Sequence, residues 1–252
     1  MAVRLATVVK YCDQLLNTRR IADYERAVNG LQLGSNICVK RIGAAVDINL
    51  RIVQKVVTAQ ANLLIVHHGL FWHDAMPITG ARYEMLRLLI QHEIAVYSSH
   101  LPLDLHPKIG NNIQLARKLG LKNPKPFLYE NGRPLGIQGE LTITREDLVE
   151  LVSRTTGSPA RLIAGGLAQV RRIGIVTGAG GSKIAKAAAE GVDTFLTGEG
   201  PHWTFVLAED LGINVIYAGH YATEAFGVKA LAQLLSKKFN LPWVFIDHPS
   251  GL

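Results

Sequence analysis

The stretch "RIGAAVDINLRIVQKVVTAQANLLIVHH", residues 41–68, decides the fold class of this chain. It reads as an apolar strand over 41–48, an amphipathic helix over 49–60 and a second apolar strand over 62–68. Short apolar runs that alternate with helices of this length predict a β-α-β unit with parallel strands. Repeated, such units build a protein of the α/β class.

The same alternation continues along both halves of the chain. The first half adds a helix over 82–93 and a strand over 94–100, and the second half has strands over 171–178, 192–199 and 213–220 with helices over 182–191, 202–212 and 223–239. When the halves are set side by side, "LLIVHHGLFW" (63–72) matches "TFLTGEGPHW" (194–203). The pair of His100 with Asp104 then falls on the pair of His220 with Glu224. We therefore expect an internal duplication that forms two related α/β lobes with mostly parallel sheets.

The segment between the two repeats is predicted as a connector. The expected division is a first lobe over 1–125, a connector over 126–169 and a second lobe over 170–252. Inside the connector we expect a short strand over 139–143 and a helix over 145–157. Thr144 suits the N-cap of this helix, with Asp147 three residues further on, as in a capping box.

Composition and charge limit the class of protein. Lysine and arginine number 27 against 20 acidic residues, and the resulting net charge of +7 suits an anionic partner. The basic residues are scattered, however, and no segment interleaves them with aromatic residues, so nucleic acid is a disfavoured partner. With no apolar run of about 18 residues and no signal-peptide core, we expect a cytoplasmic protein without a membrane partner. The two cysteines, Cys12 and Cys38, suggest neither a disulfide framework nor a metal knuckle.

Ionisable side chains gather where the predicted strands end. The set consists of His67 and His68, His100 with Asp104, and His220 with Glu224. Ligands bind beyond the carboxyl ends of parallel strands, and a cleft between two lobes would bring these ends face to face. Four imidazoles and two carboxylates exceed the ligands of one zinc ion and suit two divalent ions about 3.5–4 Å apart. Zinc, iron, manganese and cobalt all accept such ligands, so the residues do not distinguish among these metals.

Each part of this pattern also has an ordinary structural explanation. The His-x-x-x-acid spacing is that of neighbours on a helix surface, where such a pair adds little stability. Pro102 argues against a regular helix between His100 and Asp104 and favours a turn there. Among the other histidines, we expect these to be solvated or structural: His73, His92, His106, His202 and His248.

Two further features are weaker candidates for a site. The stretch "TGAGGS" (177–182) lies between a predicted strand and helix, where a phosphate can bind. It lacks the patterns of nucleotide-binding loops, so a simple tight turn is favoured. Glu199 takes the repeat position of His68 and is a candidate to line the cleft. No serine or cysteine stands in a nucleophile-elbow context, which disfavours a catalytic triad.

Six short motifs together carry a resemblance to a known family. They are "NGLQL" (29–33), "HHGLFW" (67–72), "SHLPLDLHPKIGNN" (99–112), "GELT" (139–142), "TGE" (197–199) and "GHYATE" (219–224). In this order they resemble the Nif-three-like proteins, often named GTP cyclohydrolase I type 2 homologues. The resemblance implies two α/β lobes, a dinuclear metal centre in the cleft between them and a ring-shaped homohexamer. By motif it places the metal ligands at His67, His68, Asp104, His220 and Glu224.

The leading hypothesis for function is a metal-dependent hydrolase that acts on a nucleotide-like or phosphate-bearing small molecule. Two close ions would generate a hydroxide nucleophile at neutral pH, and His100 is the candidate to pass protons. His100 stands where the family also has a histidine, which either ligates metal or supports the ligands. The rival hypotheses are a non-enzymatic metal-binding or metal-delivery protein, and a ring that engages nucleic acid or a partner protein.

Overall fold

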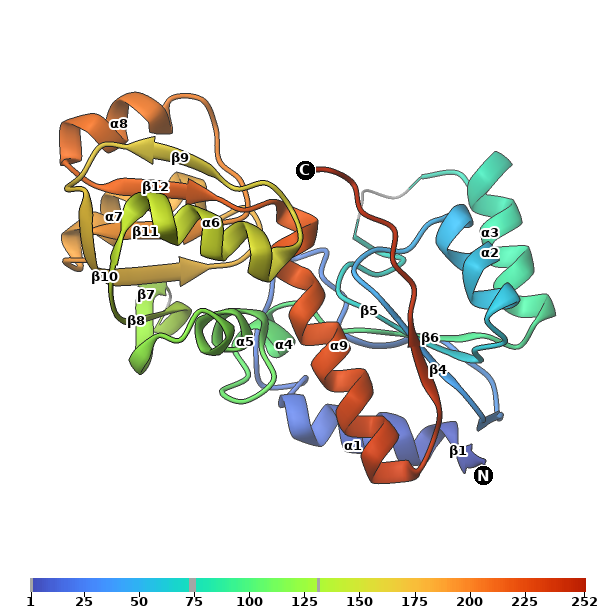
Figure 1. The fold of residues 1–252 in the computed structure, drawn as a ribbon. Helices are drawn as coiled ribbons and strands as arrows, with labels where there is room; N and C mark the ends of the chain where they lie inside the picture. The colour runs from blue at the N-terminus through green and yellow to red at the C-terminus, as the bar shows by residue number, and fades with distance from the viewer. Residues whose placement is uncertain (1, 73–75, 131) are drawn as a thin grey trace. The chain divides into compact units, whose positions relative to one another are not determined.

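The computed structural model describes residues 2–72, 76–130 and 132–252, and Figure 1 shows it as a ribbon. The chain divides into two compact units. The first holds Met1–His106 with Gly227–His248, and the second holds Pro107–Phe226 with Pro249–Leu252. These bounds differ from the expected division at 1–125, 126–169 and 170–252, because strands from the expected connector pair within the sheet of the second unit.

The first unit is an α/β unit around a five-stranded sheet. Its elements are β1 (Val3–Arg4), α1 (Leu5–Leu16), β2 (Gly30–Leu33), β3 (Cys38–Val39), β4 (Ile42–Ala45), α2 (Leu50–Thr58), β5 (Leu63–Val66), α3 (Gly80–Gln91), β6 (Ala95–Ser98), α4 (Leu101–Asp104) and β13 (Trp243–Phe245). Helix α9 (His220–Phe239) begins in the second unit and ends in the first. The predicted β-α-β alternation is thus confirmed in this unit.

The strands of the first unit run mostly parallel, in the order β13-β4-β5-β6-β2. Among the described strands of this five-stranded sheet, only β2, at the edge, pairs antiparallel, with β6; β1 and β3 form a separate two-stranded antiparallel sheet. Leu64 and Val66 of β5 face the cluster under α2 and α3. On the opposite face, Tyr97 of β6 donates a hydrogen bond of 2.8 Å to Asp13 of α1. Alternation along each strand therefore buries both faces of the sheet.

The second unit is built on a six-stranded sheet. Its elements are α5 (Asn111–Lys118), β7 (Lys122–Glu130), β8 (Arg133–Thr144), α6 (Arg145–Thr156), β9 (Arg161–Ala164), β10 (Gln169–Val176), the 3-10 turn η1 (Gly181–Lys183), α7 (Ile184–Ala189), β11 (Thr194–Thr197), α8 (Thr204–Leu211) and β12 (Asn214–Tyr217). Phe195 of β11 joins the cluster beneath α7 and α8, whereas the next residue, Leu196, joins the cluster beneath α5 and α6. Both faces of this sheet are therefore buried as well.

The strand order of the second sheet, β7-β8-β10-β11-β12-β9, shows the role of the expected connector. Only the central pairs β10/β11 and β11/β12 are parallel, and the outer strands pair antiparallel. The expected short strand over 139–143 is part of the 12-residue strand β8. Thr144 does cap α6, because its side chain accepts a hydrogen bond from the backbone N–H of Asp147. The α/β class is confirmed, with one mostly parallel and one mixed sheet.

One edge of the second sheet has an unusual composition. Strand β7 begins "KNPKP", so Pro124 and Pro126 lie on an edge strand beside the exposed lysines Lys122 and Lys125. Proline has no backbone N–H to donate to a neighbouring strand, and for this reason sheets accept it mainly at edges. The pairing of β7 with β8 is irregular between Lys122 and Lys125.

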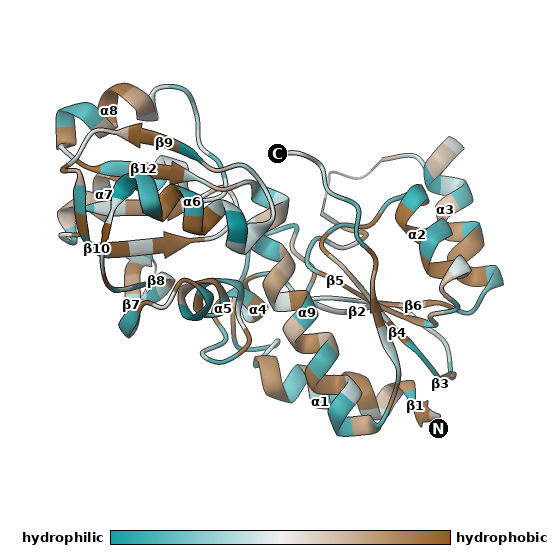
Figure 2. Ribbon diagram, viewed as in Figure 1, coloured by the Kyte–Doolittle hydropathy of each residue, from teal (hydrophilic) through white to brown (hydrophobic). Residues whose placement is uncertain are grey.

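Figure 2 shows the distribution of hydropathy over these elements. The central strands of both sheets are hydrophobic, whereas the helices alternate between hydrophilic and hydrophobic residues. This is the pattern of helices that bury one face against a sheet. Within the described part of the chain, none of the helices combines the length and apolar character that crossing a bilayer requires.

Candidate metal centre

His67 and His68 follow β5 and are fixed by the backbone at the carboxyl end of the first sheet. Their two N–H groups both donate to the carbonyl oxygen of Val46, each at 2.9 Å. Both side chains are buried, with His67 wholly inaccessible. The turn after β4 therefore holds the histidine pair in place before any side-chain contact is considered.

The second sheet uses the same backbone arrangement with different side chains. After β11, the N–H groups of Gly198 and Glu199 donate to the carbonyl oxygen of Gly178 at 2.9 and 3.0 Å. Val46 is the first residue after β4, and Gly178 is the second residue after β10. This correspondence supports the duplication that the sequence indicates, and it places Glu199 where the first unit has His68.

The imidazoles of His67 and His68 each use one ring nitrogen inside the first unit. Nδ1 of His67 lies 2.9 Å from the carbonyl oxygen of Ser99, and Nδ1 of His68 lies 2.7 Å from Oδ1 of Asp47. A carbonyl or carboxylate at Nδ1 requires a proton there, so Nε2 of the neutral ring is the atom that carries the lone pair. Metal-binding histidines are commonly oriented in this way.

The ring of His100, beyond the end of β6, is also held by an oxygen atom at Nδ1. Its Nδ1 lies 2.8 Å from Oδ1 of Asp23, and its backbone N–H donates to the side chain of Asn29. Burial alone would raise the pKa of Asp23, but hydrogen bonds from His100 and Asn29 and the charge of His100 outweigh it and hold that pKa below its usual value. Asp23 also accepts a hydrogen bond from the N–H of Leu101. The carboxylate thus fixes both the ring and the start of the next helix.

These three histidines form a group that is able to hold a metal ion. One ligand atom from each of His67, His68 and His100 lies within 4.8 Å of the other two. The ring of Trp72 covers the group, with its centroid 4.5 Å from the rings of both His68 and His100. Imidazole suits zinc, copper, iron and nickel, so the residues fit a divalent transition metal.

Asp104 brings a carboxylate to the same unit. Its Oδ2 lies 3.4 Å from Nε2 of His67. The predicted turn between His100 and Asp104 is in fact one turn of helix, α4, and Pro102 is tolerated because it lies in the first turn, where its missing N–H costs no helical hydrogen bond. Asp104 therefore reaches His67 from the end of a short helix.

The second unit contributes a histidine between two carboxylates. Nδ1 of His220 lies 2.6 Å from Oε1 of Glu199, and Nε2 lies 3.0 Å from Oε2 of Glu224. Burial opposes a charge on this ring, but the hydrogen bonds and charges of Glu224 and Glu199 outweigh it and raise the pKa of His220 to about 9. The protonated ring of His220 is therefore held between two carboxylates.

The start of α9 differs from the sequence-based expectation. The sequence predicts the helix over 223–239, with Glu224 near its positive end, but the helix begins at His220. His220 and Glu224 are consequently neighbours four residues apart on one helix face. Glu224 lies beyond the first turn, where the helix dipole is weaker, and its carboxylate lies 3.0 Å from Nε2 of His220.

The glycine-rich turn 177–182 uses its N–H groups internally. Gly178 donates to the hydroxyl of Thr223, Gly180 to the hydroxyl of Thr197, and Gly181 to the carbonyl oxygen of Glu199, each at 3.0 Å. A phosphate site needs N–H groups that point at the ligand. The favoured interpretation, a tight turn, agrees with these contacts.

The histidines expected to be ordinary do not join these groups within the described residues. His92 and His202 are exposed, while His106 and His248 are half-buried, the latter beside the ammonium of Lys55 at 3.3 Å. His73 lies outside the described residues. Sequence reasoning missed Asp23 and Asp47, the carboxylate partners of His100 and His68; their only signal was an acidic residue next to a turn.

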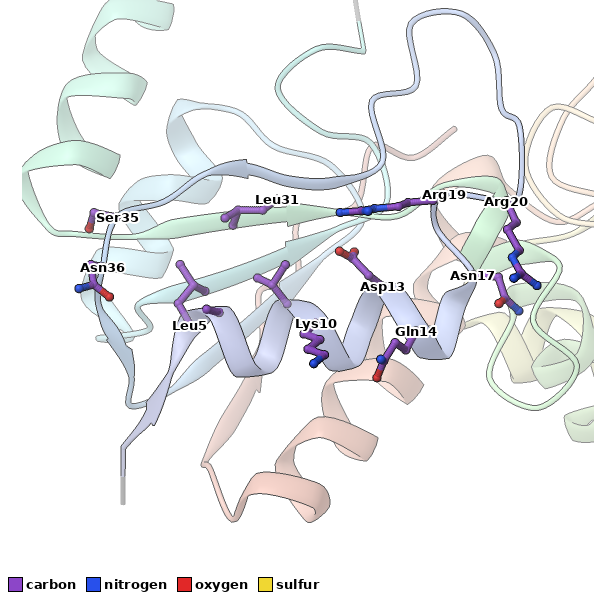
Figure 3. Close-up of a pocket in the computed structure, with 12 residues that line it drawn as sticks. Leu5, Lys10, Asp13, Gln14, Asn17, Arg19, Arg20, Leu31, Ser35 and Asn36 are labelled. Carbon is purple, nitrogen blue, oxygen red and sulfur yellow. The ribbon is translucent and has the colours of Figure 1, made fainter.

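A separate groove of about 800 Å³ lies along α1 in the first unit. Figure 3 shows Leu5 and Leu31 at one end and Asn17 and Arg20 at the other. One of its lining residues, Asp13, accepts a hydrogen bond from the hydroxyl of Tyr97. None of the candidate metal ligands of the described chain lines the groove, so it is distinct from the histidine group.

The chain is similar in sequence and fold to several known proteins. A model of the family described as Duf34/NIF3 (NGG1p interacting factor 3) matches residues 3–250. A Deinococcus radiodurans protein named GTP cyclohydrolase 1 type 2 homolog is 42% identical over 236 residues, which cover 92% of this chain and 90% of that one. The crystal structure of TTHA1606 from Thermus thermophilus has a TM-score of 0.90 at 39% identity, over 99% of this chain and 100% of that one. The protein ybgI, of unknown function, has a TM-score of 0.92 at 33% identity, with the same coverage.

Proposed function

Since the chain belongs to the Duf34/NIF3 family, we propose that it binds two divalent metal ions and acts as a metal-dependent hydrolase on a nucleotide-like small molecule. The proposed ligands are His67, His68, Asp104, His220 and Glu224, drawn from both units. The names of the relatives, which refer to a GTP cyclohydrolase, are consistent with a nucleotide as substrate.

One observation carries the proposal. The Nδ1 atom of each strand-end histidine is held by a carbonyl or carboxylate oxygen, at 2.6 to 2.9 Å. Histidines without a common role have no reason to share this ring orientation, whereas metal ligands need it to present Nε2. The same orientation at four rings, each beyond the end of a strand, favours metal binding over a structural role.

The chemistry would divide between the metal ions and the chain. When bound, two close ions lower the pKa of a shared water to about 7 and polarise the group under attack. His100 is the proposed proton carrier, because Asp23 holds its Nδ1–H and thereby leaves Nε2 to accept a proton. Trp72, against the rings of His68 and His100, would limit access of bulk water to them.

The decisive experiment measures metal and turnover on the same samples. Freshly purified protein should contain close to two divalent ions per chain by elemental analysis, and it should hydrolyse at least one member of a panel of nucleotides and phosphoesters with one of the candidate metals. One ion or none after remetallation would contradict the dinuclear site. Two readily exchanged ions without turnover would instead indicate a metal-delivery protein, and affinity for nucleic acid that falls steeply with salt would indicate a nucleic-acid ring.

We also propose that the chain assembles into a homo-oligomer, with six copies as the form that the family resemblance implies, and that it acts in the cytoplasm. Support for assembly comes from α8 and its flanks, where large apolar side chains are exposed: Trp203, Phe205, Val206 and Leu211. Exposed apolar residues concentrated on one short helix favour an interface.

A further inference from the structure

We propose that Gly178 is a positioning residue for Glu224: the absence of a side chain at this position creates the space that the Glu224 carboxylate occupies. The inference rests on the proposed metal-binding role of Glu224. It assigns a purpose to the glycine-rich turn 177–182, in which the N–H groups of Gly178, Gly180 and Gly181 donate within the protein.

The geometry around Gly178 leaves no room for a larger residue. A Cβ atom built at this position would overlap Oε1 of Glu224 and lie 3.1 Å from its Cδ. It would also lie 3.4 Å from Nε2 of His220. Both side chains that face a prospective metal ion in this unit are therefore packed directly against the Cα of Gly178.

The backbone of Gly178 is held rigidly from three sides. Its N–H donates to the hydroxyl of Thr223 at 3.0 Å, and that hydroxyl donates to the carbonyl oxygen of His220 at 3.0 Å. Its own carbonyl oxygen accepts from the N–H groups of Gly198 and Glu199 and from the hydroxyl of Thr197. The turn cannot move away from Glu224 without breaking several buried hydrogen bonds.

The hydroxyl of Thr223 links the turn to the first turn of α9. Thr223 is fully buried and lies between His220 and Glu224 in the sequence. Because one hydroxyl serves both Gly178 and His220, the position of the glycine and the position of the ligands are set together. A substitution that shifts the backbone of Gly178 would therefore also shift the start of α9, through the hydrogen bond of Gly178 to Thr223 and that of Thr223 to His220.

Glycine at this position also has a conformational reason, which must be separated from the steric one. Its φ of +71° lies in the left-handed region that side chains disfavour. Gly212 and Gly157, at the ends of α8 and α6, have φ of +64° and +73°, and a Cβ at either would meet nothing within 4 Å. Replacing either of them by alanine reproduces the backbone strain without touching Glu224.

The test compares Gly178→Ala with Gly212→Ala in the full chain. Isothermal titration with Mn²⁺ alone should show at least a tenfold loss of affinity for Gly178→Ala and none for Gly212→Ala. Both metal-free variants should melt at reduced temperatures, and Gly178→Ala at the lower one because it adds the overlap with Glu224 to the backbone strain. The double variant Gly178→Ala with Glu224→Asp should bind Mn²⁺ more tightly than Gly178→Ala, because the shorter side chain removes the overlap. Wild-type affinity in Gly178→Ala, or no recovery in the double variant, overturns the proposal.

A second readout keeps the inference separate from the proposed function. In a crystal structure of metal-free Gly178→Ala, the Glu224 carboxylate should be displaced from Nε2 of His220. A carboxylate still at hydrogen-bond distance overturns the inference even if the protein binds metal, and failure of the wild-type chain to bind metal overturns the proposed function but not the steric relation. If Gly178→Ala does not fold, Thr223→Val tests the same link: it should weaken Mn²⁺ binding several-fold, whereas Thr223→Ser should not.

Discussion

At the carboxyl ends of the two sheets, one backbone arrangement carries two different sets of side chains. In the first unit, the two residues whose N–H groups share a carbonyl oxygen are His67 and His68; in the second they are Gly198 and Glu199. The first unit therefore presents several imidazoles, and the second presents a single imidazole between carboxylates. The comparison teaches that the strand-end geometry is common to both copies while the ligand chemistry differs.

The difference also appears in how the carboxylates are delivered. Asp104 ends the four-residue helix α4, whereas Glu224 lies in the 20-residue helix α9 and against the glycine-rich turn. Asp104 is 3.4 Å from its histidine, and Glu224 is 3.0 Å from its own. The longer, more enclosed carboxylate of the second unit is the better candidate to bridge two ions.

The largest expected effect comes from replacing the carboxylates. Glu224→Gln keeps the size of the side chain but removes the charge that offsets two close cations, so both ions should weaken together, by more than about 100-fold. Asp104→Asn should mainly weaken one ion. Calorimetric titration with zinc or manganese distinguishes the two patterns. His92→Ala, at the exposed end of α3, is the control and should bind as the wild type does; equal effects of both carboxylate variants would remove the contrast between the units.

Replacing the carboxylates that contact Nδ1 of the histidine rings should give the next largest effect on metal affinity. In Asp47→Asn and Asp23→Asn, the carboxylate that favours the tautomer presenting Nε2 of His68 or His100 is lost. Residues that hold a metal ligand in this way typically contribute about 10–100-fold to metal affinity, so we expect a loss of that size. Glu199→Gln tests the same role in the second unit. Competition with a chromophoric chelator measures each affinity. Unchanged affinity in all three variants would indicate that these carboxylates serve only the fold.

Helices α3 and α8, which occupy corresponding places in the two copies, should differ in assembly. Val206→Lys on α8 places a charge on the proposed interface and should lower the mass measured by light scattering at micromolar concentration. Ile90→Lys on α3 changes an apolar residue with a larger exposed fraction, 66% against 55% for Val206, and it should leave the mass unchanged. A monomeric wild-type chain, or equal effects of the two variants, would contradict the proposal for α8.

The smallest expected effect is a pH dependence confined to the second unit. The pKa of His220 rises from 6.5 to about 9 on folding, so its stabilising contribution is complete below pH 6.5 and disappears as the pH approaches 9. The metal-free chain should therefore melt a few degrees lower at pH 8.5 than at pH 6.5, by calorimetry in a chelator. Burial also raises the pKa of the Cys12 thiol, from 9.0 to about 12. Ionisation of this thiol in the unfolded chain therefore lowers the stability of the fold only at higher pH. Glu199→Gln should reduce the dependence; the same slope in that variant would refute the assignment.

The parallel core of each unit was predictable from sequence because its signal is local. Buried strands of four residues, such as β5 and β11, appear as short apolar runs, and the helices between them show a 3.6-residue period. The flanking strands were not predictable in the same way. Strand β7 begins with lysines and prolines that read as a loop, and β8 alternates weakly. Strand β8 is held by β10, which is distant in the chain, and β7 pairs with the neighbouring β8.

The candidate site also has a part that the sequence predicts and a part that it does not. Histidines beyond strand ends were predictable, because the carboxyl edge of a parallel sheet brings such positions together. The pairing of His100 with Asp23 spans 77 positions in the chain, and that of His68 with Asp47 spans 21, so neither has a local sequence signature. The contact of Gly178 with Glu224 is likewise visible only once both backbones are placed.

The composition of strand β7 has a consequence for the behaviour of the chain at high concentration. An unpaired sheet edge is a template on which another chain can form hydrogen bonds, and this is how many proteins begin to aggregate. Pro124 and Pro126 offer no N–H groups for such pairing, and the charges of Lys122 and Lys125 repel a second copy of the same edge. Resistance to edge-to-edge association is therefore encoded in the segment of the chain that looks least like a strand.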